Sequence, residues 1–85
     1  MNRTVLIVDD EARYRDLYAR LLRDAGFDAR QAEDVPSALK AMGEATPAMV
    51  VSDVRMPGAS GLDLLRRARA DHPDMPFLLV TAYAD

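Results

Sequence analysis

Short apolar runs alternate with longer amphipathic segments along the chain. Four runs have the length and composition of strands: Val5–Val8, Phe27–Ala32, Ala48–Ser52 and Phe77–Val80. The second is more polar than the others, which predicts a strand at the edge of a sheet. The other three are almost continuously apolar, which predicts strands covered on both faces by other elements.

The three longer segments between these strands have the residue spacing of amphipathic helices. The first is expected to end at Gly26, because glycine is common just after the end of a helix. Its apolar positions, expected to share one face, are Tyr14, Leu17, Tyr18, Leu21, Leu22 and Ala25.

Capping residues predict where the other two helices begin. Asp34 can cap the second helix with Pro36 in its first turn, and this helix should stop near Gly43. Ser60 and Asp63 have the spacing of a capping box for the third helix. The residues expected on the buried faces are Ala38, Leu39 and Met42 in the second helix and Leu62, Leu65 and Ala68 in the third.

The order of elements is strand, helix, strand, helix, strand, helix, strand. Right-handed crossovers between parallel strands place helices on both faces of the sheet. The pattern therefore predicts an α/β fold with a doubly wound parallel sheet, and 85 residues leave room for a single domain, 1–85.

Composition narrows the functional classes. The formal net charge is -3, with 11 Lys and Arg against 14 Asp and Glu, which argues against direct contact with nucleic acid by this segment. Cysteine is absent, so there is no disulfide or thiolate metal site, and a cytoplasmic location is expected. The apolar run before Asp9 is too short for a signal peptide or a membrane span, so no membrane contact is expected.

Polar side chains follow three of the predicted strands. Asp9 and Asp10 come after the first strand, Asp53 after the third and Thr81 after the fourth. Ligands of open parallel sheets bind beyond the carboxyl ends of the strands, so these residues are expected to meet there. Three crowded carboxylates repel one another unless a cation neutralises them. The sequence thus predicts a site for Mg²⁺, or Mn²⁺, that suits phosphoryl transfer.

Other charged residues have simpler explanations. Glu11 is expected only to favour the start of a helix, and His72 to be a solvated cation at a helix C-terminus. The arginines of the first helix, together with Arg66, Arg67 and Arg69 of the third, are expected on solvated faces without a catalytic role.

Three motifs in order resemble the receiver domain of bacterial two-component response regulators. They are Val8-Asp9-Asp10-Glu11, then Asp53-Val54-Arg55-Met56-Pro57 with Gly61 following, then Val80-Thr81-Ala82. The resemblance covers the whole chain and implies a flavodoxin-like receiver fold with strand order 2-1-3-4-5.

The resemblance also implies roles for individual residues. Asp53 would accept a phosphoryl group from the phosphohistidine of a sensor histidine kinase, and Asp10, Asp53 and the backbone carbonyl of Arg55 would bind the metal. Asp9 would act on the metal through water. Thr81 would hydrogen-bond the phosphoryl group, and the small Ala82 would leave access to it. Met56, Pro57 and Gly61 would form the turn after the acceptor.

Such a domain would be a phosphoacceptor with its own phosphorylation and dephosphorylation chemistry, not a multiple-turnover enzyme on an external substrate. The stretch from Asp53 to Gly58 and the stretch from Thr81 to Asp85 resemble receivers that control transcription activators, including activators with an ATPase domain. Control of transcription through an output domain is therefore expected.

One departure from the family affects these expectations. The last helix, strand and helix of a receiver, with the lysine that contacts the phosphoryl group, have no counterpart within residues 1–85, and the single Lys40 lies on the second helix. The fourth strand is then expected to expose its backbone along Pro76–Thr81, with an apolar surface around Phe77, Leu79 and Val5. Self-association by edge pairing or by exchange of elements is expected.

Three alternatives compete with the receiver interpretation. A magnesium-dependent phosphohydrolase would need an Asp-x-Asp pattern, but Ala12 stands where its second acid would be. A flavodoxin-like nucleotide or flavin module would need a phosphate-binding loop, which Glu11-Ala12-Arg13 does not supply. A truncated receiver that serves only as a folding or dimerisation module stays open.

Overall fold

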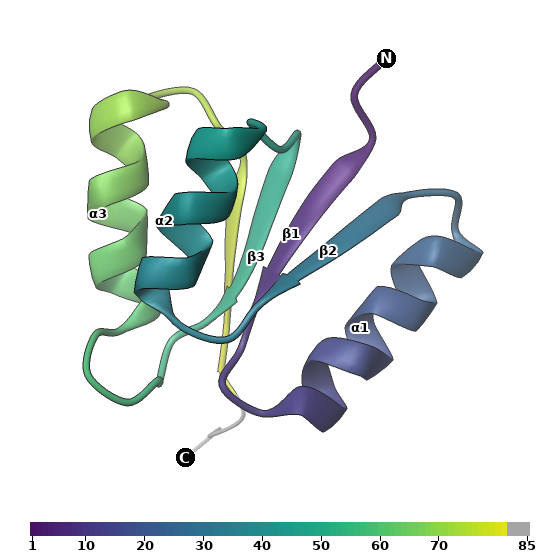
Figure 1. The fold of residues 1–85 in the computed structure, drawn as a ribbon, viewed down its shortest axis with the longest axis horizontal. Helices are drawn as coiled ribbons and strands as arrows, with labels where there is room; N and C mark the ends of the chain where they lie inside the picture. The colour runs from purple at the N-terminus through teal and green to yellow at the C-terminus, as the bar shows by residue number, and fades with distance from the viewer. Residues whose placement is uncertain (82–85) are drawn as a thin grey trace.

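The structure, a computed structural model, describes residues 1–81 as a four-stranded parallel sheet with three helices (Figure 1). The strand order is β2-β1-β3-β4, so the predicted doubly wound, flavodoxin-like order is confirmed over these strands. The elements in chain order are β1 Thr4–Val8, α1 Ala12–Asp24, β2 Asp28–Ala32, α2 Val35–Glu44, β3 Met49–Asp53, α3 Gly61–Asp71 and β4 Phe77–Val80.

The register of the sheet brings the ends of the strands together at one edge. Val8 at the end of β1 pairs with Ala32 on β2 and with Ser52 on β3. Asp53, the last residue of β3, pairs with Val80 of β4. Because all four strands run in the same direction, the residues that follow them leave the sheet on the same side.

The larger of the two buried cores lies between the sheet and the pair α2 and α3, which stand side by side in Figure 1. The smaller core lies under α1, which contacts β1 and β2. Buried residues of the larger core are Leu6, Val8, Ala32, Val35, Ala38, Met42, Val50, Leu64, Ala68 and Met75. Those of the smaller core are Ile7, Ala19 and Ala29.

The predicted buried face of α1 is partly wrong. Tyr18 and Leu22 pack against the smaller core, but the fully buried residue is Ala19, and Leu17 and Leu21 are exposed. The strands that this helix contacts most are β2 and β1, and the side chains on the rest of its circumference stay partly or fully exposed. The helix ends at Asp24, with Ala25 as its C-cap.

The predicted buried face of α3 is also partly wrong. Leu62 is 44% exposed, Leu65 is half-buried, and Leu64 and Ala68 are buried. The helix begins at Gly61, whose backbone lies against β3, and the buried stripe continues from there at the helical spacing. One residue further on, a rotation of about 100° carries Leu62 away from the sheet.

Both predicted caps, Asp34 and Ser60, are present, and in the structure each of them forms a capping box. The Asp34 carboxylate accepts the Ser37 amide at 2.9 Å, and the Ser60 hydroxyl accepts the Asp63 amide at 3.2 Å. Hydrogen bonds from the Ser37 side chain and backbone lower the pKa of Asp34. The backbone hydrogen bond from Ser60 lowers the pKa of Asp63 in the same way. These local bonds fix the starts of the two helices that cover the larger core.

β4 forms one edge of the sheet, and its outer side pairs with no strand among residues 1–81. Leu78 is 51% exposed there, whereas Phe77 packs against the larger core and Leu79 is half-buried. The expectation that Val5 would be uncovered is wrong, because it lies on the central strand β1 and is only 3% exposed. Within the described residues, no helix is both long and apolar enough to cross a membrane.

Candidate metal centre

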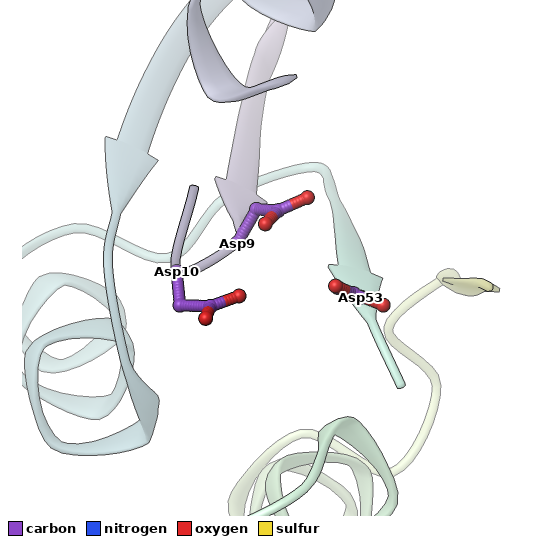
Figure 2. Close-up of side chains that lie close together, drawn as sticks. All are labelled: Asp9, Asp10 and Asp53. Atoms are coloured by element: carbon purple, nitrogen blue, oxygen red, sulfur yellow. The ribbon is translucent and has the colours of Figure 1, made fainter. Parts of the chain in front are cut away.

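Three carboxylates meet at the edge of the sheet where β1 and β3 end. Asp9, Asp10 and Asp53 each contribute an oxygen, and these oxygens lie within 4.8 Å of one another. In Figure 2, Asp9 and Asp10 direct their carboxylates toward the side on which Asp53 lies. Asp9 is buried, Asp53 is half-buried and Asp10 is exposed, so this carboxylate cluster runs from the protein interior to solvent.

Backbone hydrogen bonds hold the two strand ends that carry the cluster. The Asp9 amide donates to the Ala32 carbonyl at 3.1 Å, and the Val54 amide donates to the Val80 carbonyl at 2.9 Å. One oxygen of Asp9 accepts the Glu11 amide at 3.0 Å, and one of Asp53 accepts the Arg55 amide at 3.2 Å. Each of these two carboxylates is therefore oriented by the chain that follows it.

Burial raises the pKa of Asp9 above its usual range. The hydrogen bond from the Glu11 amide acts in the opposite direction, and repulsion from Asp53, Asp10 and Glu11 adds to the rise. A divalent cation among the three carboxylates would remove this repulsion. Mg²⁺ and Mn²⁺ prefer oxygen ligands, so the donors present fit either ion.

Replacing Asp9 with Asn should raise the stability of the metal-free chain at neutral pH. The pKa of Asp9 is higher in the folded than in the unfolded chain, so its ionisation favours unfolding. That penalty is absent below the unfolded pKa, grows as the pH rises, and is complete above the folded pKa. Asn keeps an oxygen that can accept the Glu11 amide.

Urea unfolding in the presence of a chelator tests this expectation. Asp9→Asn should have a higher midpoint than the unaltered chain at pH 7.5, and the two midpoints should approach each other near pH 3. Asp16→Asn, on the exposed surface of α1, is the matched control and should leave the midpoint unchanged. An equal or lower midpoint for Asp9→Asn at pH 7.5 would contradict the assignment of a penalty to this carboxylate.

An open cleft of about 470 Å³ adjoins the carboxylate cluster. Its volume leaves room for a group larger than a single ion beside Asp10 and Asp53. The residues that line it are Asp10, Asp53, Val54, Arg55, Met56, Pro57 and Ser60. The cleft thus joins two of the three carboxylates to the segment expected to form the turn after Asp53.

Gly61 packs directly against the backbone of Asp53. A Cβ atom at position 61 would stand 2.2 Å from the Asp53 carbonyl oxygen and 3.0 Å from the Ser52 hydroxyl oxygen. The Gly61 amide also donates to the Val54 carbonyl at 2.9 Å. The N-terminus of α3 therefore touches the carboxyl end of β3 closely enough that only glycine fits.

Thr81 directly follows Val80, the last residue of β4, and Val80 pairs with Asp53. Thr81 is exposed at this position. Its expected contact with a phosphoryl group stays a prediction. Ala82, expected to leave access to the site, lies outside the described residues.

The expectation of solvated arginines is wrong for Arg15, which is half-buried and donates to the Asp9 carbonyl at 2.7 Å. It is also wrong in part for Arg23, which donates to the Ala29 carbonyl at 2.9 Å, and for Arg69, which donates to the carbonyl of Met75. Ser52, another residue that the sequence patterns missed, is buried and donates to the Asp53 carbonyl at 2.9 Å. The three arginines and Ser52 have the spacing of ordinary polar residues on a helix or strand. Only the fold shows which backbone carbonyls accept their hydrogen bonds.

The chain matches a family model and curated proteins of known class. The model for the response regulator receiver domain matches residues 5–85. The DNA-binding transcriptional regulator NtrC of Escherichia coli K12 is 37% identical over 81 residues, which cover 95% of this chain and 17% of NtrC. The chain therefore corresponds to a small part of that relative.

Solved structures agree with the sequence match. The response regulator TrrA of Thermotoga maritima, crystallised in complex with Mg²⁺-BeF, superposes with a TM-score of 0.92 at 34% identity, covering 96% of this chain and 71% of TrrA. TrrA in complex with the histidine kinase ThkA superposes with a TM-score of 0.90 at 34% identity, covering 98% of this chain and 72% of that one.

Proposed function

Because this chain belongs to the response regulator receiver domain family, we propose that Asp53 is its phosphoacceptor and that a sensor histidine kinase is the donor. The observation that carries the proposal is the carboxylate cluster, which opens into a cleft large enough for a phosphoryl group. The similarity to TrrA, which has been crystallised with a histidine kinase, supports the choice of donor.

The proposed transfer needs no reactant beyond the donor. An oxygen of the ionised Asp53 carboxylate forms a bond to phosphorus while the bond from phosphorus to the donor imidazole nitrogen breaks. The electron pair of that bond stays with the nitrogen, and the imidazole leaves as a neutral ring when its other nitrogen carries a proton. The product is an acyl phosphate on Asp53.

We assign the cation to Asp10, Asp53 and the backbone carbonyl of Arg55, with Asp9 acting through water. A bound Mg²⁺ or Mn²⁺ would neutralise charge on the phosphoryl oxygens during transfer. The hydrogen bond that the Arg55 amide donates to the Asp53 carboxylate keeps this carboxylate directed toward Arg55, whose backbone carbonyl would be the third ligand. Thr81 would donate its hydroxyl to the phosphoryl group, and Ala82 would leave a path to it.

The remaining properties follow from this role. We propose that the chain acts in the cytoplasm as a switch and not as a multiple-turnover enzyme, and that it controls a transcription activator, as the similarity to NtrC suggests. Self-association along the outer edge of β4 stays a prediction.

The proposal is tested with a small phosphodonor such as phosphoramidate. The chain should gain one phosphoryl group in the presence of Mg²⁺ and none when a chelator is present. Because Asp10 is a proposed metal ligand, Asp10→Ala should weaken Mg²⁺ binding at least about tenfold and slow phosphorylation. Calorimetric titration with Mg²⁺ and mass spectrometry of the intact chain measure these two effects.

Asp16→Ala is the control, since it removes an exposed carboxylate of α1 that is not part of the carboxylate cluster. This variant should bind Mg²⁺ and accept phosphate like the unaltered chain. Unchanged Mg²⁺ affinity in Asp10→Ala would show that the metal site lies elsewhere, and labelling that persists in the chelator would remove the metal from the proposal.

A further inference from the structure

Arg15 connects the ends of two strands beside the carboxylate cluster. It lies in the first turns of α1, and its guanidinium donates to the Asp9 carbonyl at 2.7 Å. The Nε atom of the same side chain donates to the Gln31 side-chain oxygen at 3.3 Å, near the end of β2. The side chain is half-buried, so the bond to Asp9 is partly shielded from water.

The Asp9 carbonyl is the point at which the chain leaves the sheet. β1 ends at Val8, and the Asp9 amide makes the last backbone bond to β2. The carbonyl of Asp9 and the amide of Asp10 belong to one planar peptide unit, so the orientation of the first sets the orientation of the second. A donor that holds this carbonyl therefore directs the backbone from which the Asp10 side chain extends.

We propose that Arg15 is a positioning residue for the cation site. By holding the peptide unit between Asp9 and Asp10, it keeps the Asp10 carboxylate converged with Asp9 and Asp53. Arg15 touches neither the ion nor the phosphoryl group in this role. The inference rests on the proposed function only in taking the carboxylate cluster to be a cation site.

Arg23 offers a matched comparison on the same helix. Its guanidinium donates to the Ala29 carbonyl at 2.9 Å, so it also joins α1 to a backbone carbonyl of the sheet region. Ala29 is near the start of β2, at the opposite end of the strand from the cluster. If Arg15 served only to attach α1 to the sheet, replacing either arginine would have the same effect on Mg²⁺ binding.

The test compares Arg15→Gln, Arg23→Gln and the unaltered chain. Mg²⁺ affinity is measured by calorimetric titration, and folding by urea unfolding in a chelator. We expect Arg15→Gln to weaken Mg²⁺ binding about tenfold, as loss of an indirect support for a metal site typically does, and Arg23→Gln to change it less than twofold. Both variants should lose similar amounts of stability, because each loses one part-buried bond to a backbone carbonyl and the additional bond from Arg15 to Gln31 is exposed to solvent.

Two further variants keep the test decisive. Arg15→Lys retains a donor that can reach the Asp9 carbonyl and should recover most of the affinity. Gln31→Ala leaves Arg15 in place without its second partner, and a severalfold loss of Mg²⁺ affinity is expected even if Arg15→Gln fails to fold.

The outcomes separate this inference from the proposed function. If the unaltered chain binds no Mg²⁺, the proposed cation site itself is wrong. If the unaltered chain binds Mg²⁺ and both Arg15→Gln and Gln31→Ala bind it equally well, the positioning role is wrong while the cation site stands. Equal losses of affinity in Arg15→Gln and Arg23→Gln would also overturn the positioning role.

Discussion

Asp53→Asn should abolish phosphorylation of the chain by phosphoramidate or by a phosphorylated histidine kinase. The amide keeps the shape of the side chain and an oxygen that can accept the Arg55 amide, so the local structure should persist. It lacks the negative charge that makes a carboxylate oxygen the nucleophile. Loss of that charge also relieves repulsion of Asp9, so the variant should remain folded in a chelator.

Mass spectrometry of the intact chain and of its peptides measures the effect. The unaltered chain should carry one phosphoryl group, on the peptide that contains Asp53, and Asp53→Asn should carry none. Asp74→Asn, an exposed site between α3 and β4, is the control and should be labelled normally. Labelling that persists in Asp53→Asn at another residue would assign the acceptor role to that residue.

Gly61→Ala should be among the most damaging single-methyl substitutions in this chain. The added Cβ would stand 2.2 Å from the Asp53 carbonyl oxygen, which is backbone and cannot rotate away. Either the start of α3 or the end of β3 must move, at a cost of about 2–3 kcal/mol of unfolding free energy. That is a large share of the roughly 5–15 kcal/mol that holds a typical domain folded. Because the shift occurs at Asp53, Mg²⁺ binding should weaken as well.

Gly43→Ala supplies a control with the opposite expected sign. Gly43 lies in α2, and a Cβ there would meet no atom within 4 Å. Alanine favours helix over glycine, so this variant should gain up to about 1 kcal/mol. Urea unfolding with Mg²⁺ titration measures both variants. If Gly61→Ala unfolds at the same urea concentration as the unaltered chain, the close contact between α3 and β3 is not a constraint on the site.

Features set by local chemistry could be predicted from the sequence. The apolar runs of β1 and β3 indicate buried strands, and the Asp34 and Ser60 caps locate the starts of α2 and α3 because each cap bonds to a backbone amide three residues away. The proximity of Asp9, Asp10 and Asp53 could also be predicted, since the carboxyl ends of parallel strands share one edge. Local order and topology were sufficient for these features.

Features set by packing between elements could not be predicted in this way. Leu62 and Leu64 are chemically identical, and only the contact of Gly61 with β3 decides which of them is buried. No local sequence pattern distinguishes Arg15 from the other arginines of α1, and its role depends on where the end of β1 comes to lie. In both cases the deciding atom belongs to a neighbouring element, and its position depends on how the elements pack.

The residues of the proposed cation site lie on two kinds of backbone, one held by the sheet and one outside it. Asp9 and Asp53 sit where backbone bonds to β2 and β4 continue past the paired strands, so moving either of them would require opening the sheet. Asp10 and Arg55 are exposed and follow the last paired residues of β1 and β3, and the peptide unit before Asp10 is held by the Arg15 side chain and not by a neighbouring strand. Ions of different radius, such as Mg²⁺ and Mn²⁺, would therefore be accommodated at Asp10 and Arg55 without movement of the strands. The Asp53 carboxylate, the proposed acceptor, would meanwhile keep its place, and its approach to a phosphoryl group would be insensitive to which ion is bound.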